Sequence, residues 1–69
     1  MKNNLKDLRQ NKSISQDELA GILKVSRQTI NSIETGKFDP SLTLVIKLTR
    51  YFQVGLEKIF IFEDEKWSQ

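Results

Sequence analysis

Two short amphipathic segments joined by a tight turn occupy residues 16–33, and they constrain the fold more than any other feature of this chain. Two helices that cross steeply need a small residue where their backbones approach, and Ala20 occupies that position. The turn between them needs an apolar plug, which Val25 supplies. The second helix needs inward side chains three residues apart, here Ile30 and Ile33. This spacing predicts a helix-turn-helix motif.

The signals at the helix ends agree with this spacing. Ser15 and Glu18 form a capping box at the start of the first of the two helices. Ser26 is placed to cap the second helix, and Gly36 is placed to end it in the left-handed conformation that glycine adopts readily. We predict four short helices, over residues 4–11, 16–23, 27–35 and 55–60. A fifth and longer helix lies between the last two.

The longer helix follows Pro40, and either Asp39 or Ser41 can cap it. Its apolar residues form two stripes on neighbouring faces, so the helix needs cover on more than one side. The first stripe comprises Leu42, Val45, Ile46, Thr49 and Phe52, and the second comprises Leu44, Leu48 and Tyr51. In the short helix after it, the residues expected on the core side are Leu56, Ile59 and Phe60.

The length of 69 residues allows one domain with one small core, because so short a chain buries only about 60% of the surface that it exposes when unfolded. We therefore expect an all-α bundle of five helices over residues 1–60, followed by a tail over residues 61–69. The sequence has no Cys and no His, which excludes disulfides, thiolate or imidazole metal sites, and Cys or His nucleophiles. No cofactor and no metal are expected.

The charges are unevenly distributed along the chain. Residues 1–37 contain seven basic and four acidic side chains, whereas residues 38–69 contain four basic and five acidic ones. A basic first half suits a polyanionic partner, although an ordinary mixed surface gives an asymmetry of this size as well. No apolar run approaches the roughly 20 residues of a membrane span, and the polar N-terminus is unlike a signal peptide. Without disulfides, a cytoplasmic protein is the simpler expectation.

The outward face of the helix over residues 27–35 carries the candidate binding residues. The second helix of a helix-turn-helix enters the major groove of DNA by its N-terminus. With about 100° of rotation per residue, and with Ile30 and Ile33 inward, its polar side chains point away from the core. Gln forms paired hydrogen bonds with adenine, and Arg does so with guanine. The predicted base-reading set is Arg27, Gln28, Asn31 and Ser32. The alternative is a polar face that meets only solvent.

Taken together, these features resemble the Cro/cI-like family of helix-turn-helix repressors, also called lambda-repressor-like or XRE-like. The likeness covers about residues 4–60. It is carried by the stretches SQDELA at 15–20, VSRQTI at 25–30, IETGK at 33–37 and PSL at 40–42, and by Val54, Leu56, Ile59 and Phe60 in the closing helix. The resemblance implies a five-helix bundle that binds operator DNA as a dimer and regulates transcription.

The resemblance also implies one internal contact and shows two departures. Arg9 and Glu34 are implied to pair, tying the first helix to the recognition helix, which is the helix over residues 27–35. We interpret this pair as structural, because a buried charge that loses its partner is costly. Lys24 stands where the family often has glycine, and a left-handed Lys costs about 1 kcal/mol relative to glycine. Gly55 stands where the family often has a capping serine.

Four further positions are expected to contact DNA phosphates. Gln16 lies at a helix N-terminus, where free backbone N–H groups favour an anion. Thr35 and Lys37 flank the far end of the recognition helix, and the resemblance implies that they clamp the DNA backbone together with Gln16 and Ser26. For Lys37, a plain surface lysine is the alternative.

A homodimer is expected, because a monomer gains few contacts from one half-site, and a two-fold dimer places its recognition helices about 34 Å apart, one turn of DNA. Apolar residues in excess of the core are the interface candidates, since an exposed apolar cluster usually marks a partner surface. They are Leu44, Tyr51, Ile61 and Phe62, with Trp67 as a further candidate. The alternating residues 60–63 can form a short strand against residues 1–3. Alternatively, the tail folds back on its own core.

The leading hypothesis for function is a stand-alone transcriptional regulator, most simply a repressor, that binds a palindromic operator in double-stranded DNA. The resemblance then implies a cytoplasmic protein of bacterial, archaeal or phage origin. The alternative is an antitoxin or adaptor with the same fold, whose main partner is another protein. An enzyme is not expected, because the available carboxylates, Lys, Ser, Thr and Tyr form no recognisable nucleophile–base arrangement.

Overall fold

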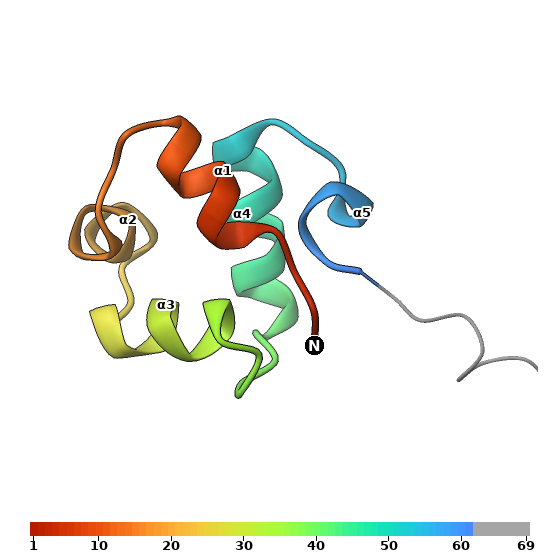
Figure 1. Cartoon of the computed structure of the whole chain (residues 1–69), viewed down its shortest axis with the longest axis horizontal. Coiled ribbons are helices and arrows are strands. Elements are labelled where there is room, and N and C mark those ends of the chain that lie inside the picture. The colour runs from red at the N-terminus through yellow and green to blue at the C-terminus, as the bar shows by residue number, and fades with distance from the viewer. Residues whose placement is uncertain (62–69) are drawn as a thin grey trace, which may run out of the picture.

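Apolar side chains at helical spacing organise residues 1–61, the part of the chain that the computed structural model describes, into five helices (Figure 1). The helices are α1 Leu5–Asn11, α2 Gln16–Leu23, α3 Arg27–Glu34, α4 Leu42–Phe52 and α5 Leu56–Ile59. The described residues contain no strand, so the expected all-α bundle is confirmed. None of the five helices is long and apolar enough to cross a membrane.

Local hydrogen bonds fix the starts of the helices. Ser15 and Glu18 make the predicted capping box, because the Glu18 N–H donates to Ser15 Oγ at 3.0 Å and the Ser15 N–H donates to Glu18 Oε1 at 2.8 Å. Ser26 Oγ accepts from the backbone N–H three residues ahead at 3.1 Å. Ser41, and not Asp39, caps α4 in the same way. The start of α3 is therefore set by its own sequence.

All five helices contribute to one core. Its fully buried side chains are Leu5 from α1, Leu19 from α2, Ile30 and Ile33 from α3, Leu48 from α4 and Ile59 from α5. Ala20, the small residue expected where α2 and α3 approach, is only 3% exposed. Figure 1 shows α3 along the lower edge of the bundle, with α2 above its N-terminal end and α5 on the opposite side of the molecule. The helix-turn-helix is thus held by a core that lies on one side of α3.

The rotation of α4 differs from the one that we expected. Leu44, Leu48 and Phe52, each one turn apart, lie in the core, whereas Leu42 is 75% exposed. Our prediction that Leu44 lies in an interface between two copies was therefore wrong, because this side chain is buried within its own chain. Leu56, which we expected on the core side of α5, is instead 51% exposed.

The other interface candidates occupy different environments. Tyr51 is half-buried, and the edge of its ring meets Phe52 with the ring centroids 4.9 Å apart. Ile61 is 42% exposed. Phe62 and Trp67 lie outside the described residues. Of the described candidates, Ile61 is the one that offers most apolar surface to a partner.

The N-terminal residues lie beside the end of α5. Two backbone hydrogen bonds join them, from the Asn4 N–H to the Ile59 carbonyl at 2.7 Å and from the Ile61 N–H to the Lys2 carbonyl at 2.9 Å, and together they form an antiparallel bridge between Asn3 and Phe60. The short strand that we expected over residues 60–63 is, in the part described, this isolated bridge. Residues 62 and 63 lie outside the described residues.

Lys24 ends α2 in the left-handed conformation, with φ 61° and ψ 46°. We expect Lys24→Gly to raise the free energy of unfolding by about 0.5–1 kcal/mol, because glycine adopts this conformation without the clash of a Cβ atom. Urea denaturation followed by circular dichroism measures the change. Lys24→Ala is the matched control, since it removes the same charge and keeps the Cβ atom. An equal gain in both variants would contradict the explanation.

Candidate nucleic-acid interface

The polar face of α3 is accessible along the helix. Arg27, Gln28 and Asn31 are exposed, and Ser32 is half-buried. These four predicted base-reading residues lie opposite the fully buried Ile30 and Ile33, so the buried side holds the helix while the polar side remains available. The structure brings the whole predicted set together on one exposed helix face.

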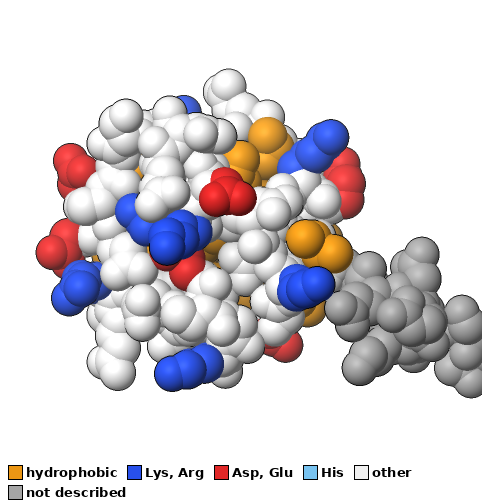
Figure 2. Space-filling model, in the orientation of Figure 1, with side chains coloured by type: hydrophobic (Ala, Val, Ile, Leu, Met, Phe, Trp, Pro, Cys, Tyr) orange, Lys and Arg blue, Asp and Glu red, His pale blue; other side chains and the backbone are white. Residues whose placement is uncertain are grey.

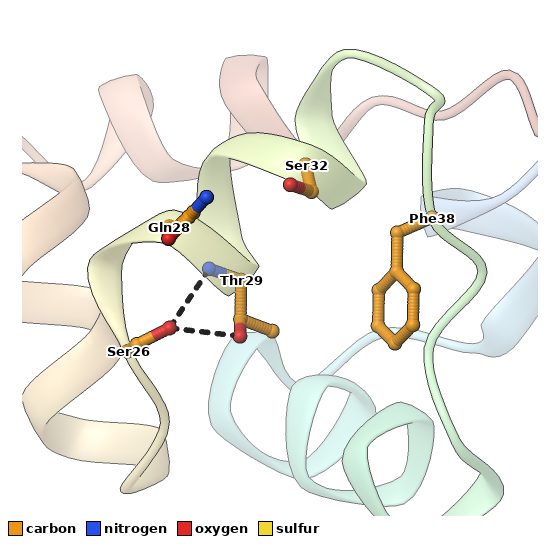
Figure 3. Close-up of a pocket in the computed structure, with 5 residues that line it drawn as sticks. All are labelled: Ser26, Gln28, Thr29, Ser32 and Phe38. Carbon is orange, nitrogen blue, oxygen red and sulfur yellow. Dashed lines mark hydrogen bonds between the residues drawn. The ribbon is translucent and has the colours of Figure 1, made fainter.

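A hollow of about 250 Å³ separates α3 from the loop that follows it (Figure 3). It is lined by Ser26, Gln28, Thr29, Ser32 and Phe38. The Ser26 and Thr29 hydroxyls are 2.9 Å apart and hydrogen-bonded, and the Phe38 ring faces Thr29 across the hollow. The sequence analysis missed Thr29 and Phe38. An aromatic residue in an otherwise polar loop was the signal for Phe38, which is 48% exposed.

A buried ion pair ties α1 to the end of α3. Arg9 Nε donates to Glu34 Oε2 at 2.6 Å, and Arg9 Nη2 donates to Glu34 Oε1 at 3.2 Å. The remaining terminal nitrogen, Nη1, donates to the Ile14 carbonyl at 2.9 Å. The two side chains are 10% and 3% exposed. The hydrogen bond with Glu34 raises the pKa of Arg9 above its ordinary value, so the guanidinium is charged at neutral pH.

Gln16 joins the start of α2 to the same carboxylate. Its Nε2 donates to Glu34 Oε1 at 3.0 Å and to Asn31 Oδ1 at 3.2 Å. The side-chain amide is therefore bonded inside the protein. This leaves the backbone N–H groups at the start of α2 as the donors that Gln16 and its neighbour present to an anion.

The other predicted phosphate contacts lie at the two ends of α3. Ser26 caps its start, while the Thr35 hydroxyl donates to the Asn31 carbonyl at 2.9 Å and Lys37 is exposed. On the face shown in Figure 2, basic side chains are spread among uncharged and acidic ones. The cations on that face lie apart from one another and form no dense basic patch.

The N-terminal residues hold the other end of α3, a contact that the sequence analysis missed. Asn3 Nδ2 donates to the Ile33 carbonyl at 2.9 Å. The N-terminal ammonium of Met1 donates to the Gly36 carbonyl at 3.3 Å and lies 3.4 Å from Asp39 Oδ1. These partners are more than 25 residues apart in the sequence, so no local pattern indicates them.

Comparison with known proteins places this geometry in a family. A helix-turn-helix family matches residues 5–59, which include all five helices. The chain belongs to the XRE-type helix-turn-helix family. Members of this family are DNA-binding transcription regulators and not enzymes, so the expected class and the resemblance seen in the sequence are both confirmed.

Relatives of the same family match the chain over nearly its full length. An uncharacterised HTH-type transcriptional regulator of Methanocaldococcus jannaschii is 52% identical over 66 residues, which cover 96% of this chain and 100% of the relative. A regulator of the same description from Archaeoglobus fulgidus is 41% identical and covers 100% of this chain and 99% of its own. One from Bacillus subtilis is 40% identical, with 94% and 98% covered.

This XRE-type domain also has an apolar groove of about 730 Å³ between α4, α5 and the N-terminus, which we term the α4–α5 groove. Its lining includes Met1, Leu42, Val45, Leu56, Phe60 and Ile61. Figure 2 shows apolar side chains reaching the surface on the α5 side of the molecule. The groove is formed by residues of α4 and α5 that the sequence analysis placed in the core, together with Ile61.

Removing one member of the buried pair leaves the other charge without a partner. We expect Glu34→Ala to lower the free energy of unfolding by about 3 kcal/mol, as measured by urea denaturation. The matched control is Arg9→Met with Glu34→Leu, which replaces both charges by apolar side chains and should lose about 1 kcal/mol or less. Equal losses in the two variants would show that packing, and not the unpaired charge, accounts for the effect.

Proposed function

We propose that this protein is a transcriptional repressor that binds a palindromic operator as a homodimer, with the N-terminal end of α3 in the major groove. One observation carries this proposal. The four polar side chains Arg27, Gln28, Asn31 and Ser32 share the uncovered face of a helix whose opposite side is fully buried. A helix of this kind, held in a helix-turn-helix, fits the major groove. The site of action is then the chromosome, in the cytoplasm.

In this arrangement, different side chains of α3 contact different bases of the operator. Arg27, at the tip of the helix, has the reach and the paired donors to bind guanine O6 and N7. Gln28 has one donor and one acceptor, which match adenine N7 and N6. Asn31 and Ser32 lie further along the same face and read the adjacent bases.

The contacts to phosphate position the helix in the groove. The free N–H groups at the start of α2, at Gln16, face one strand, and Ser26, Thr35 and Lys37 contact the backbone near the two ends of α3. These contacts carry no sequence information by themselves, so they add affinity for all DNA. Lys37 supplies a full positive charge and therefore contributes most to the dependence on salt.

For the homodimer we propose that the α4–α5 groove receives a second copy of this chain. A two-fold interface must be self-complementary. Leu42, 75% exposed, projects beside the groove that it helps to line, so a knob and a hole lie next to each other on one surface. In a two-fold pair, Leu42 of each copy can enter the groove of the other.

The exposed side chains and the position of the groove also support binding of a second copy of this chain. Four large apolar side chains that line it are exposed, namely Met1 at 41%, Leu42 at 75%, Leu56 at 51% and Ile61 at 42%. Apolar surface of this kind is typical of the centre of a protein–protein interface. The groove is lined by residues of α4, α5 and the N-terminus. In Figure 1, α5 lies on the side of the molecule toward which the C-terminal end of α3 points, so a two-fold axis there would direct both α3 N-termini outward. Outward-facing reading helices suit two half-sites of a palindrome.

The experiment that tests the function is selection from a randomised duplex pool, followed by a salt titration with the enriched sequence. Enrichment of a palindrome with half-sites about 10 bp apart, and binding that weakens steeply with salt, are the expected results. Binding without any enriched sequence would overturn the proposal and favour a protein partner as the main target.

In the same assay, Gln28→Ala should reduce the preference for operator over random DNA by about 1–3 kcal/mol, because the paired hydrogen bonds to one base are lost. Lys37→Ala is the control, and should weaken binding to both DNAs about equally. An unchanged operator-to-random ratio in Gln28→Ala would show that α3 does not read bases as assigned.

Leu42→Glu should convert the dimer to a monomer in sedimentation equilibrium, because a charge then enters an apolar interface. Ile22→Glu is the matched control, since Ile22 is also exposed, at 46%, and does not line the groove. A wild-type chain that stays monomeric at all concentrations would contradict the interface.

A further inference from the structure

We propose that Phe38 is a further specificity-determining residue, whose ring contacts the C5-methyl group of a pyrimidine in the operator. Thymine and 5-methylcytosine carry this group, whereas uracil and unmodified cytosine lack it. The inference rests on the proposed function, because the contact lies beside the reading face of α3. It adds a residue of the loop after α3 to the residues that distinguish one base from another.

The loop after α3 is held against the reading helix. Gly36, with φ 78°, reverses the direction of the chain. The Ser32 carbonyl then accepts hydrogen bonds from the Lys37 N–H at 3.0 Å and from the Phe38 N–H at 3.2 Å. Because Ser32 belongs to the proposed base-reading set, these bonds place Phe38 next to the face of α3 that enters the groove.

The Phe38 side chain has little cover from its own chain. It is 48% exposed, and the apolar side chains that pack against the core of the described residues do not include it. It lines the hollow beside α3 and also a second hollow of about 250 Å³ toward α4. Contact with an apolar group of the DNA therefore removes from water a ring surface that the folded domain leaves exposed.

The hollow between Phe38 and α3 suits an apolar group. The hydroxyls of Ser26 and Thr29 bond to each other at 2.9 Å, and Ser26 Oγ also accepts from the Thr29 N–H at 3.1 Å. With its hydroxyl turned to Ser26, Thr29 directs its methyl group toward the Phe38 ring (Figure 3). None of the five lining residues is charged, so the hollow is a poor site for a phosphate.

The C5-methyl group of thymine is the apolar feature that a base pair presents in the major groove, and Phe and the Thr methyl group are suited to contact it. Gln28 also lines the hollow, so the pyrimidine lies next to the base that Gln28 contacts. The methyl group of 5-methylcytosine occupies the same position on the ring as that of thymine. Methylation of an operator cytosine at this position therefore strengthens binding, which makes the hollow a point at which DNA methylation acts on this regulator.

The test uses the full chain and the palindrome enriched from the randomised pool. Each thymine is replaced in turn by uracil, and each cytosine by 5-methylcytosine, so that every base pair is tested through its pyrimidine. At one position we expect the methyl group to raise the affinity of the wild type about fourfold, the factor that corresponds to burial of one such carbon group. Phe38→Ala should reduce this factor to nearly one and leave methyl effects at other positions unchanged.

Ile22→Ala is the matched control. Ile22 is 46% exposed, close to the value for Phe38, and lines neither of the two hollows beside that ring. Its truncation removes a similar amount of exposed apolar surface and should leave the methyl effect at about fourfold. Circular dichroism of the two free variants verifies that both keep the fold of the wild type.

Two results would overturn the inference. One is a wild type whose affinity no C5-methyl group changes. The other is a Phe38→Ala variant that keeps the full methyl effect at every position; weaker binding of this variant to all duplexes alike would then make the ring a contact of the sugar–phosphate backbone. Failure of the proposed function is a separate result, because no palindrome would be enriched with the wild type.

Proton NMR of the complex tests the contact directly. We expect a nuclear Overhauser cross-peak between the ring protons of Phe38 and the C5-methyl protons of the pyrimidine at that position. The cross-peak should be present with thymine and with 5-methylcytosine alike. Cross-peaks from the ring to deoxyribose protons alone would contradict the inference.

Discussion

Three helices meet at the carboxylate of Glu34, and the position of the reading helix depends on that contact. The carboxylate lies in the last turn of α3, accepts two hydrogen bonds from Arg9 of α1, and accepts another from Gln16 of α2. A side chain 3% exposed and bonded on both oxygens has very little freedom to move. Because each of the first three helices supplies one partner, the tilt of α3 cannot change without breaking a charged hydrogen bond.

Apolar packing supplies the complementary constraint on α3. Ile30 and Ile33 are fully buried against the core, which prevents rotation of the helix about its own axis. Asn3 adds a hydrogen bond to the Ile33 carbonyl at the far end. The tilt of α3 is therefore fixed by the ion pair of Glu34 with Arg9, and its rotation by the two buried isoleucines. The hydrogen bond from the Asn3 side chain holds its C-terminal end. A rigid helix suits sequence reading, since displacement of the reading side chains weakens their hydrogen bonds to bases steeply.

The sequence predicts the helix-turn-helix well because the signals that define it are local. The capping box of Ser15 and Glu18 and the cap at Ser26 need only neighbouring residues to act, and both are present in the structure. The rotation of α4 is a different matter, because both of its stripes are apolar and each satisfies the helical period. Packing with the other helices, which is not local, places Leu44 inside and Leu42 outside.

The same distinction applies to the candidate site. The outward face of α3 follows from helical geometry once Ile30 and Ile33 are known to be buried. The contact of Gln16 with Asn31 joins two helices, so no pattern along the chain indicates it. The position of Phe38 could not be predicted from the sequence either, because the path of the loop after α3 brings its side chain beside that helix.

The bridge between residues 1–4 and residues 59–61 has a consequence for synthesis of the chain. Residues 1–4 are synthesised before residues 59–61, with which they pair in the folded domain. A nascent chain that lacks residues 59–61 therefore has no partner for residues 1–4 on that side, although the helix-turn-helix, residues 16–33, has already been synthesised. Its core still lacks Ile59, which is fully buried in the folded domain. These contacts therefore form only after residue 61 has been synthesised, and a ribosome that stalls before residue 59 leaves residues 1–4 without them.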